Sequence, residues 1–292
     1  MPCLQGNSQY LFPVYSQYML NGLALNPAYA GSRDVFNITL GYRNQWVGFD
    51  GAPITQTLSA HTPLRNENIA LGVFLHNEQI DVRNNTSIYM NYAYRIPIGN
   101  GRLSLGLKAG GVLRNARWSN LSLHDPGDIV FTEPGTSDLL PNFGFGAYYY
   151  TDRYYFGASI PYFLSDSTRD AKAVSYHNIK DYNYLVTGGV VLGKGDIKVK
   201  PGFLLKYNAK NPLQIDANLS FIISDLIWIG ASYRLEDALV GLVKLQLSDQ
   251  LRLGYTYDYS LGQLSKYNNG SHEIVLIYDF RYKVSAVNPR YF

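Results

Sequence analysis

The stretch from Leu239 to Ser260, LVGLVKLQLSDQLRLGYTYDYS, constrains the fold of this chain most. Apolar and polar side chains alternate along it with a period of two, the pattern of a β-strand with one apolar and one polar face. The link Ser248-Asp249-Gln250 divides it into two arms and predicts a tight hairpin. Each arm has about ten residues, the length of a strand that crosses a bilayer at a tilt of about 45°. We therefore interpret the apolar face as the one that meets lipid and the polar face as the lining of a wet lumen.

The composition agrees with a membrane barrel. Charged residues make up 16% of the 292 residues, against about 25% in soluble domains, and 26 residues are Tyr. No run of about 18 apolar residues is present, so no membrane-spanning helix is expected. Strands can span a bilayer only as a closed barrel, because backbone polar groups in lipid must be paired within the protein. The net charge of +3 is small and the Lys and Arg residues are scattered, which argues against nucleic-acid binding.

The alternation recurs along the chain and predicts an all-β fold, a transmembrane antiparallel up-and-down barrel of about 14 strands. The first predicted strand begins at Phe36 and the last one ends near Tyr282. Connections after even-numbered strands are short, and those after odd-numbered strands are generally longer, the longest being Arg114–Pro141 and Leu164–Asp181. Outer-membrane barrels show this asymmetry, with tight periplasmic turns and long outer loops. Both termini are therefore expected on the periplasmic side.

The predicted organisation is an amino-terminal periplasmic or luminal segment (1–34), the barrel (35–283) and a carboxyl-terminal tail (284–292). Met1–Gln9 lacks the basic start and the apolar core of a secretory signal. Because an outer-membrane protein needs such a signal, we expect that further residues precede those given. Cys3 is the only cysteine, so no intrachain disulfide can form.

By parity, meaning their odd or even place in the alternating pattern of each strand, a set of charged side chains should face the lumen. They could line an open, ion-selective pore, or they could pair with one another and fill a closed interior. Both signs are mixed among them, which favours pairing, and an obstructed barrel does not work as a porin. The set comprises Arg43, Lys108, Arg234, Lys244, Arg252, Asp258, Asp279 and Arg281.

The sequence predicts no catalytic, cofactor-binding or metal site. The five histidines are far apart, and none has the near spacing of a metal site. A hydrolase would need a nucleophile such as Ser104, Ser159 or Ser220, but nothing in the local sequence singles one out. Acidic loop turns such as Asp125–Asp128 could touch calcium, although such turns are usually just solvated. We therefore predict a protein that is not an enzyme and has no cofactor.

Two motifs resemble those of the PorP/SprF family of outer-membrane proteins. The opening motif comprises Gln17-Tyr18-Met19, Asn21 and Asn26-Pro27-Ala28-Tyr29-Ala30-Gly31, and the second Arg43-Asn44-Gln45-Trp46, Gly51-Ala52-Pro53 and Gln56. The ending Asn288-Pro289-Arg290-Tyr291-Phe292 is also similar to that of the family. The resemblance implies a bacterial outer-membrane component of the type IX secretion system, linked to gliding motility, that helps to present or hold a secreted protein at the cell surface. The implied partners are the carboxyl-terminal sorting domain of a secreted surface protein or adhesin, periplasmic secretion proteins, and outer-membrane lipid.

The motif residues have a physical interpretation without any reaction. Asn26-Pro27-Ala28 is typical of a turn or cap, because Asn can bond to its own backbone and Pro fixes the next dihedral angle. Arg43 and Gln45 should point inward, where they could bond to the amino-terminal segment and act as a luminal latch.

For the partner, the two longest loops offer the obvious surface. Their candidate apolar contacts are Trp118, Phe131, Tyr176 and His177. The predicted function is thus a non-enzymatic barrel that binds and retains a secreted protein. A porin or solute channel is the alternative, and an enzyme of the membrane-phospholipase kind is a third.

Overall fold

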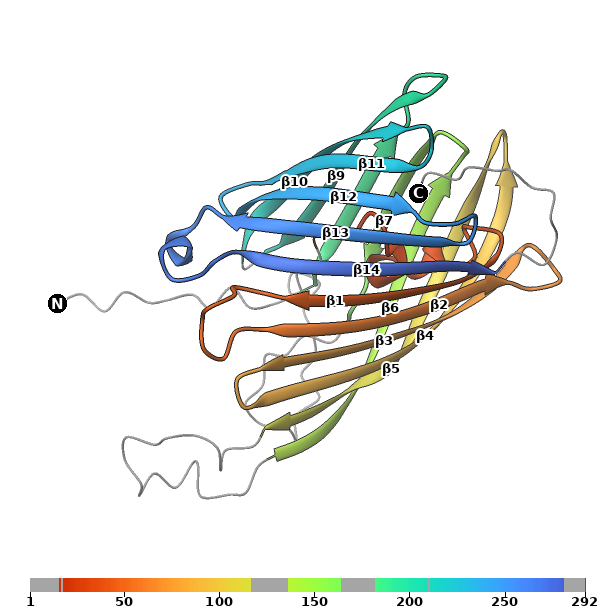
Figure 1. The fold of residues 1–292 in the computed structure, drawn as a ribbon. Coiled ribbons are helices and arrows are strands. Elements are labelled where there is room, and N and C mark those ends of the chain that lie inside the picture. The colour runs from red at the N-terminus through yellow and green to blue at the C-terminus, as the bar shows by residue number, and fades with distance from the viewer. Residues whose placement is uncertain (1–15, 17, 117–135, 164–181, 210, 281–291) are drawn as a thin grey trace, which may run out of the picture.

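The computed structural model describes residues 16, 18–116, 136–163, 182–209, 211–280 and 292, and in this part of the chain fourteen strands surround a short segment with two helical turns (Figure 1). The helical turns are α1 (Gly22–Leu25), η1 (Pro27–Tyr29) and, between the last two strands, η5 (Gln263–Lys266). The strands are β1 (Phe36–Asn44), β2 (Ile54–Pro63), β3 (Ile69–Ile80), β4 (Arg83–Ile98), β5 (Gly101–Ala116), β6 (Thr136–Tyr150), β7 (Tyr154–Ile160), β8 (Tyr184–Val190), β9 (Ile197–Asn208), β10 (Asn211–Ile223), β11 (Ile227–Arg234), β12 (Ala238–Gln246), β13 (Leu251–Ser260) and β14 (Ser271–Phe280).

The sheet is closed. Each strand pairs antiparallel with its neighbours in sequence, and β1 pairs with β14 along a seam that runs from Phe36 opposite Phe280 to Asn44 opposite His272. Closure leaves no free strand edge, so the strand backbones satisfy one another as a bilayer requires. The predicted all-β class, the antiparallel barrel and its strand number are confirmed.

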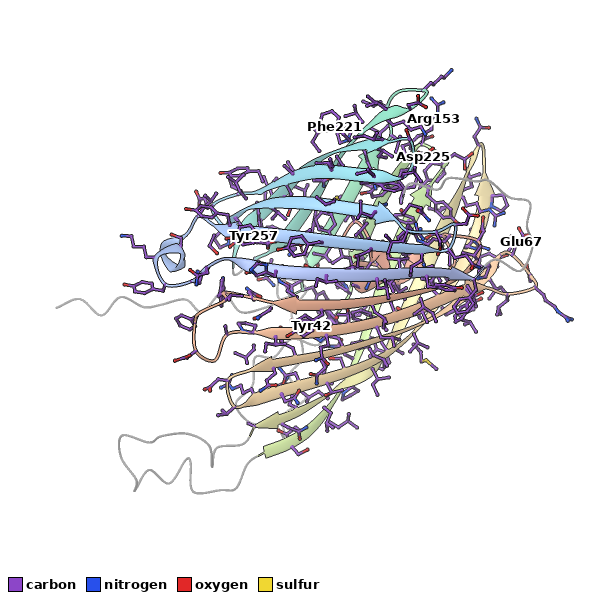
Figure 2. The ribbon with its side chains drawn as sticks, viewed as in Figure 1. Tyr42, Glu67, Arg153, Phe221, Asp225 and Tyr257 are labelled. Atoms are coloured by element: carbon purple, nitrogen blue, oxygen red, sulfur yellow. The ribbon has the colours of Figure 1, made fainter. Side chains whose placement is uncertain are left out.

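The faces of the strands follow the predicted parity. On β12 and β13, Leu239 and Tyr259 point outward and expose 47% and 57% of their surface, whereas Lys244 and Arg252 point inward and expose 4% and 6%. Phe221 on β10 lies on the same apolar exterior (Figure 2). This exterior gives the barrel a surface that suits hydrocarbon. No helix in the described ranges has both the length and the apolar character to cross a membrane.

The two ends of the barrel differ. One, which we call the turn end, carries the connections after even-numbered strands: 64–68, 99–100, 151–153, 191–196, 224–226 and 247–250. The other, which we call the loop end, carries 45–53, 81–82, 117–135, 161–183, 209–210, 235–237 and 261–270. Glu67, Arg153 and Asp225 mark the turn end in Figure 2. The longest connections lie at the loop end, as expected.

One predicted loop is too long. β5 and β6 stay paired as far as Ala116 opposite Thr136, so Arg114 faces Asp138 within the hairpin rather than starting a loop. An antiparallel ladder is held by backbone hydrogen bonds and does not require apolar alternation, so polar residues extend both strands here. The second predicted loop, Leu164–Asp181, lies outside the described residues.

Candidate functional site

A luminal segment, formed by Ser16 and residues 18–34, runs inside the barrel from the loop end to the turn end (Figure 1). Its first described residue bonds to Arg43 near the loop end of β1, and its last residues lead into β1 at the turn end. All three residues of η1 are buried, and so are Leu23, Ala24 and Leu25 of α1. The segment therefore forms an apolar core within the lumen.

Asn26 sets the shape of this segment at its centre. Its side-chain Oδ1 accepts a hydrogen bond from the Ala28 N–H at 2.9 Å, which caps η1, and Pro27 occupies the first position of the turn. The Asn26 Nδ2 donates to the carbonyl of Ala147 on β6 at 2.9 Å. One side chain thus shapes the turn and fastens it to the barrel wall.

The wall has glycines where the segment touches it. A Cβ added at Gly106 of β5 would lie 2.1 Å from the Ala28 backbone nitrogen, and one added at Gly146 of β6 would lie 2.0 Å from the Asn26 Oδ1. Any larger residue would occupy the space that the segment takes. These glycines are therefore needed for close backbone approach.

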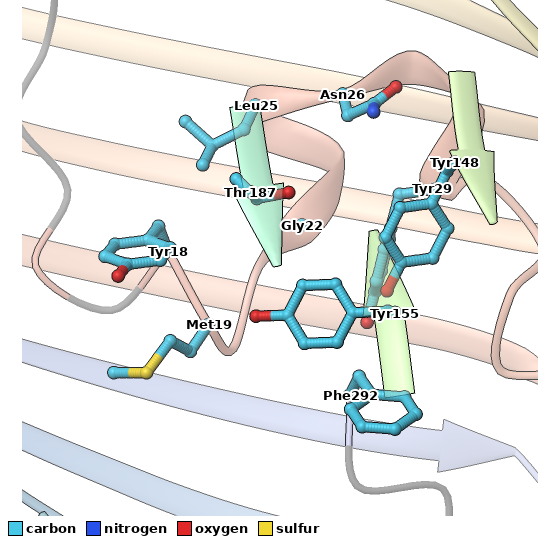
Figure 3. Close-up of a pocket in the computed structure, with 10 residues that line it drawn as sticks. All are labelled: Tyr18, Met19, Gly22, Leu25, Asn26, Tyr29, Tyr148, Tyr155, Thr187 and Phe292. Atoms are coloured by element: carbon cyan, nitrogen blue, oxygen red, sulfur yellow. The ribbon is translucent and has the colours of Figure 1, made fainter. Parts of the chain in front are cut away.

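A small cavity lies beside the segment. A cavity of about 30 Å³ lies between the segment and the wall formed by β6–β8 (Figure 3). Tyr18 and Leu25 of the segment line it, together with Tyr155 of β7 and Phe292. This volume holds only about one or two water molecules. The segment and its aromatic neighbours therefore pack closely at this place.

An ionic network anchors the segment at the loop end. The Arg43 Nη1 donates to the Ser16 Oγ at 2.8 Å and to a Glu273 carboxylate oxygen at 3.1 Å, and its Nη2 donates to Asp258 at 2.9 Å. The Ser16 backbone N–H also donates to Glu273, at 2.9 Å, and its hydroxyl donates to Asp258. The Arg43, Asp258 and Glu273 side chains are 3–6% exposed, so the pairs are desolvated and weakly screened by salt.

The same network continues across the lumen to β10 and β11. Arg234 lies 3.4 Å from an Asp216 carboxylate oxygen and 3.6 Å from Asp258. The Tyr18 hydroxyl donates to Asp216 at 3.1 Å and accepts a hydrogen bond from the Asn218 Nδ2 at 2.6 Å. Ser16 and Tyr18 of the segment are thereby bound to β10, β11, β13 and β14 in addition to β1.

A second anchor holds the segment at the turn end. The Arg95 side chain is completely buried, and its Nη1 donates to the Gly31 carbonyl at 2.6 Å and to an Asp34 carboxylate oxygen at 2.5 Å. Its Nη2 donates to the Glu67 carbonyl, and the Gly31 N–H donates to the His61 Nδ1 at 3.2 Å. Backbone and side chains of the segment are therefore both bound where it enters β1.

The predicted inward charges are inward in the described part of the chain. Seven of the eight are 2–7% exposed, and Arg281 lies outside the described residues. Arg43 and Arg234 pair with Asp258, and Arg252 pairs with Asp279. Lys244 lies 3.4 Å from the centre of the Trp228 ring. Most of these charges thus neutralise one another instead of lining an open pore.

The structure places the predicted site residues as follows. Arg43 reaches the segment through Ser16. Gln45 is half-buried one residue beyond β1, and its backbone N–H donates to the Pro53 carbonyl at 3.0 Å. The predicted loop contacts Trp118, Phe131, Tyr176 and His177 lie outside the described residues.

Sequence reasoning missed Arg95, Asp216 and Ser16. Arg95 stands between Tyr94 and Ile96, which continue the alternating apolar positions Ile88, Met90 and Tyr92, so the alternation alone places Arg95 in the lumen. Of the serines considered as nucleophiles, Ser159 donates instead to the Leu25 carbonyl at 2.8 Å. Among the described residues, no three metal-ligating side chains gather at one place.

Comparison with known proteins gives one family match. The model of the type IX secretion system membrane protein PorP/SprF matches residues 7–278. No curated protein matches. Similar solved structures include the outer-membrane protein Omp33 of Acinetobacter baumannii, 8% identical, with a TM-score of 0.49 over 85% of this chain and 99% of that one. A triple mutant of the Rhodopseudomonas blastica porin (9% identity, TM-score 0.37, 84% and 99%) and outer membrane phospholipase A from Escherichia coli (12%, 0.39, 85% and 92%) are also similar.

Proposed function

The chain belongs to the PorP/SprF family of type IX secretion system membrane proteins and has an outer-membrane barrel fold, and we propose that it is a non-enzymatic barrel that binds a secreted surface protein and retains it at the cell. The part that it recognises is the carboxyl-terminal sorting domain of that protein. Periplasmic components of the same secretion system are its partners on the other side of the membrane.

The observation that carries this proposal is the occupied lumen. The luminal segment is bound at the loop end through Arg43 and at the turn end through Arg95. Each anchor uses charge-assisted hydrogen bonds in a buried setting, which are the stronger kind. A barrel that holds its own chain in this way offers solutes little free cross-section, and this favours a holding role over a channel.

The proposed orientation puts the turn end in the periplasm and the loop end at the cell surface. Short periplasmic turns and longer outer loops are the usual arrangement of outer-membrane barrels. The partner then meets the two longest connections, with Trp118, Phe131, Tyr176 and His177 as apolar contacts and Arg43 and Gln45 as the latch below them.

Affinity purification of the tagged chain from native membranes tests the proposal. We expect a secreted surface protein to co-elute, and replacement of residues 117–135 by a short turn should abolish its retention while the barrel still assembles. Replacement of residues 261–270, another loop-end connection, is the matched control and should leave retention unchanged. Equal retention by both variants would contradict the proposed surface.

Conductance in planar bilayers separates this role from that of a porin. A barrel filled by its own segment should pass only rare, small current steps at salt concentrations at which porins conduct steadily. A steady open-pore current through the unmodified chain would refute the holding role.

A further inference from the structure

Lys108 has an environment unlike that of the inward arginines. It lies on β5, two residues beyond Gly106 toward the loop end, and is 2% exposed. Its Nζ lies 4.0 Å from the centre of the Tyr162 ring, 4.6 Å from that of Tyr89 and 5.9 Å from that of Phe74. The ammonium group therefore lies among three aromatic rings, on the side of the luminal segment that faces the loop end.

This ammonium group has no acceptor among the described residues. Its Nζ makes no hydrogen bond there, and no carboxylate lies within ion-pair distance of it. Asn91 is its cross-strand partner on β4 and is 2% exposed, and both its Nδ2 and its Oδ1 are also without hydrogen-bond partners in the described part of the chain. Aromatic rings attract a cation but accept its protons poorly. Buried donors of this kind require an acceptor.

The contrast with the rest of the lumen makes the arrangement specific. Arg43, Arg95, Arg234 and Arg252 each have a carboxylate within 3.6 Å. Two other lysines in the described part of the chain also lie beside aromatic rings, Lys244 over the Trp228 ring and Lys200 at 5.3 Å from the centre of the Phe292 ring, but their strand partners are Trp228 and Ser220 rather than an amide. The pair Lys108 and Asn91 thus combines an unneutralised positive charge with an adjacent amide donor.

We propose that Lys108 and Asn91 form a binding site for a carboxylate group that enters the lumen from the loop end. One carboxylate oxygen would accept from the Lys108 ammonium and the other from the Asn91 Nδ2. The rings of Phe74, Tyr89 and Tyr162 would pack against the apolar part that bears the carboxylate. The apolar part of an organic acid can contact these rings and a chloride ion cannot do so to the same extent, which favours an organic acid over a simple anion.

The position of the site suggests the source of the carboxylate. Lys108 lies on β5, which continues directly into the connection 117–135, and Tyr162 lies in the connection 161–183, which follows β7. These are the two longest loop-end connections. A polypeptide bound at those connections could reach the site with its terminal carboxylate. This assignment of the source rests on the proposed function, whereas the carboxylate site itself does not.

Ligand-dependent thermal unfolding of the full chain in detergent tests the site. Benzoate, at constant ionic strength against chloride, should raise the unfolding temperature of the unmodified protein by several degrees. Lys108→Met keeps the length and packing of the side chain but removes the charge, and should weaken benzoate binding at least tenfold. Lys244→Met removes another buried lysine that lies over an aromatic ring and is the matched control, with unchanged binding. If Lys108→Met fails to fold, Asn91→Leu supplies the test, because it removes the amide and keeps the lysine.

The source is tested with a short peptide offered as the free acid and as the carboxyl-terminal amide. The free acid should bind at least tenfold more tightly than the amide. Equal binding by the two peptides would overturn the terminal carboxylate as the ligand, and a benzoate effect equal to that of chloride, or unchanged in Lys108→Met, would overturn the site. A barrel that binds benzoate through Lys108 but retains no surface protein keeps this site and refutes the proposed function; the opposite result refutes only the site.

Discussion

Gly106→Ala should displace the luminal segment from the barrel wall. The added Cβ would lie 2.1 Å from the Ala28 nitrogen and 2.4 Å from the Pro27 carbonyl carbon, which are backbone atoms and cannot rotate away. Restoring an ordinary contact of 3.4 Å requires the segment to move by about 1.3 Å. A shift of this size also stretches the bond from Asn26 to the Ala147 carbonyl, now 2.9 Å, beyond hydrogen-bonding distance.

The energy follows from these two effects. Overpacking a filled interior costs about 1–3 kcal/mol, and leaving a buried polar group unsatisfied costs about 1–3 kcal/mol more. Together they weaken the seated position of the segment by roughly 2–6 kcal/mol, which corresponds to more than a tenfold change in its occupancy. The strands themselves need not change, because the new methyl group points into the lumen.

Planar-bilayer conductance measures the result, with heat-modifiable gel mobility as the check that the barrel has folded. Gly106→Ala should conduct in long open steps, while the unmodified chain remains mostly closed. Gly241→Ala on β12 is the matched control, since a Cβ there meets nothing within 4 Å, and it should behave like the unmodified chain. If Gly106→Ala folded with unchanged conductance and unchanged stability, the contact between the segment and β5 would not exist as described.

Two further predictions concern the anchors. Arg95→Met should lower the free energy of unfolding by about 3–5 kcal/mol, because it leaves the partners of a buried charge unpaired, whereas Arg102→Met, whose side chain is 27% exposed, should cost less than about 1 kcal/mol; equal costs in urea titration would argue against a buried anchor. Arg43→Met and Ser16→Ala should be non-additive by about 0.5–3 kcal/mol in a double-mutant cycle, and strict additivity would mean that Ser16 is not bound by Arg43.

The strands were predictable because their pattern is local. Alternation assigned Leu239 to the outside and Lys244 to the lumen, and the structure agrees. The end of the β5–β6 hairpin was not predictable in this way. There Leu113 opposite Leu139 still belongs to the outward apolar face, but Arg114 faces Asp138 and Gly111 faces Pro141, so the alternation is too short to mark where the strands end.

The anchors were predictable only in part, because their partners are distant in sequence. Parity placed Arg43 in the lumen, but its bonds to Asp258 and Glu273 join residues more than 200 positions apart. Nothing local distinguishes Arg95, which binds the segment, from Arg252, which pairs with Asp279 within the wall. Which inward charge serves as an anchor depends on the path of the luminal segment, and that path follows from packing rather than from any repeat.

The anchors also bear on how the barrel closes. β1 and β14 are the first and last strands, so their pairing joins the most distant parts of the barrel and carries the largest loop-closure cost. Arg43 on β1 bonds to Glu273 on β14, and Ser16 bonds to both. The segment therefore bridges the seam at the loop end, where Arg43 stands directly opposite Glu273 in the register. Emptying the lumen would remove this bridge as well as the apolar contacts, so segment docking and seam stability are coupled, and the luminal segment is part of the closed fold rather than a loosely held gate.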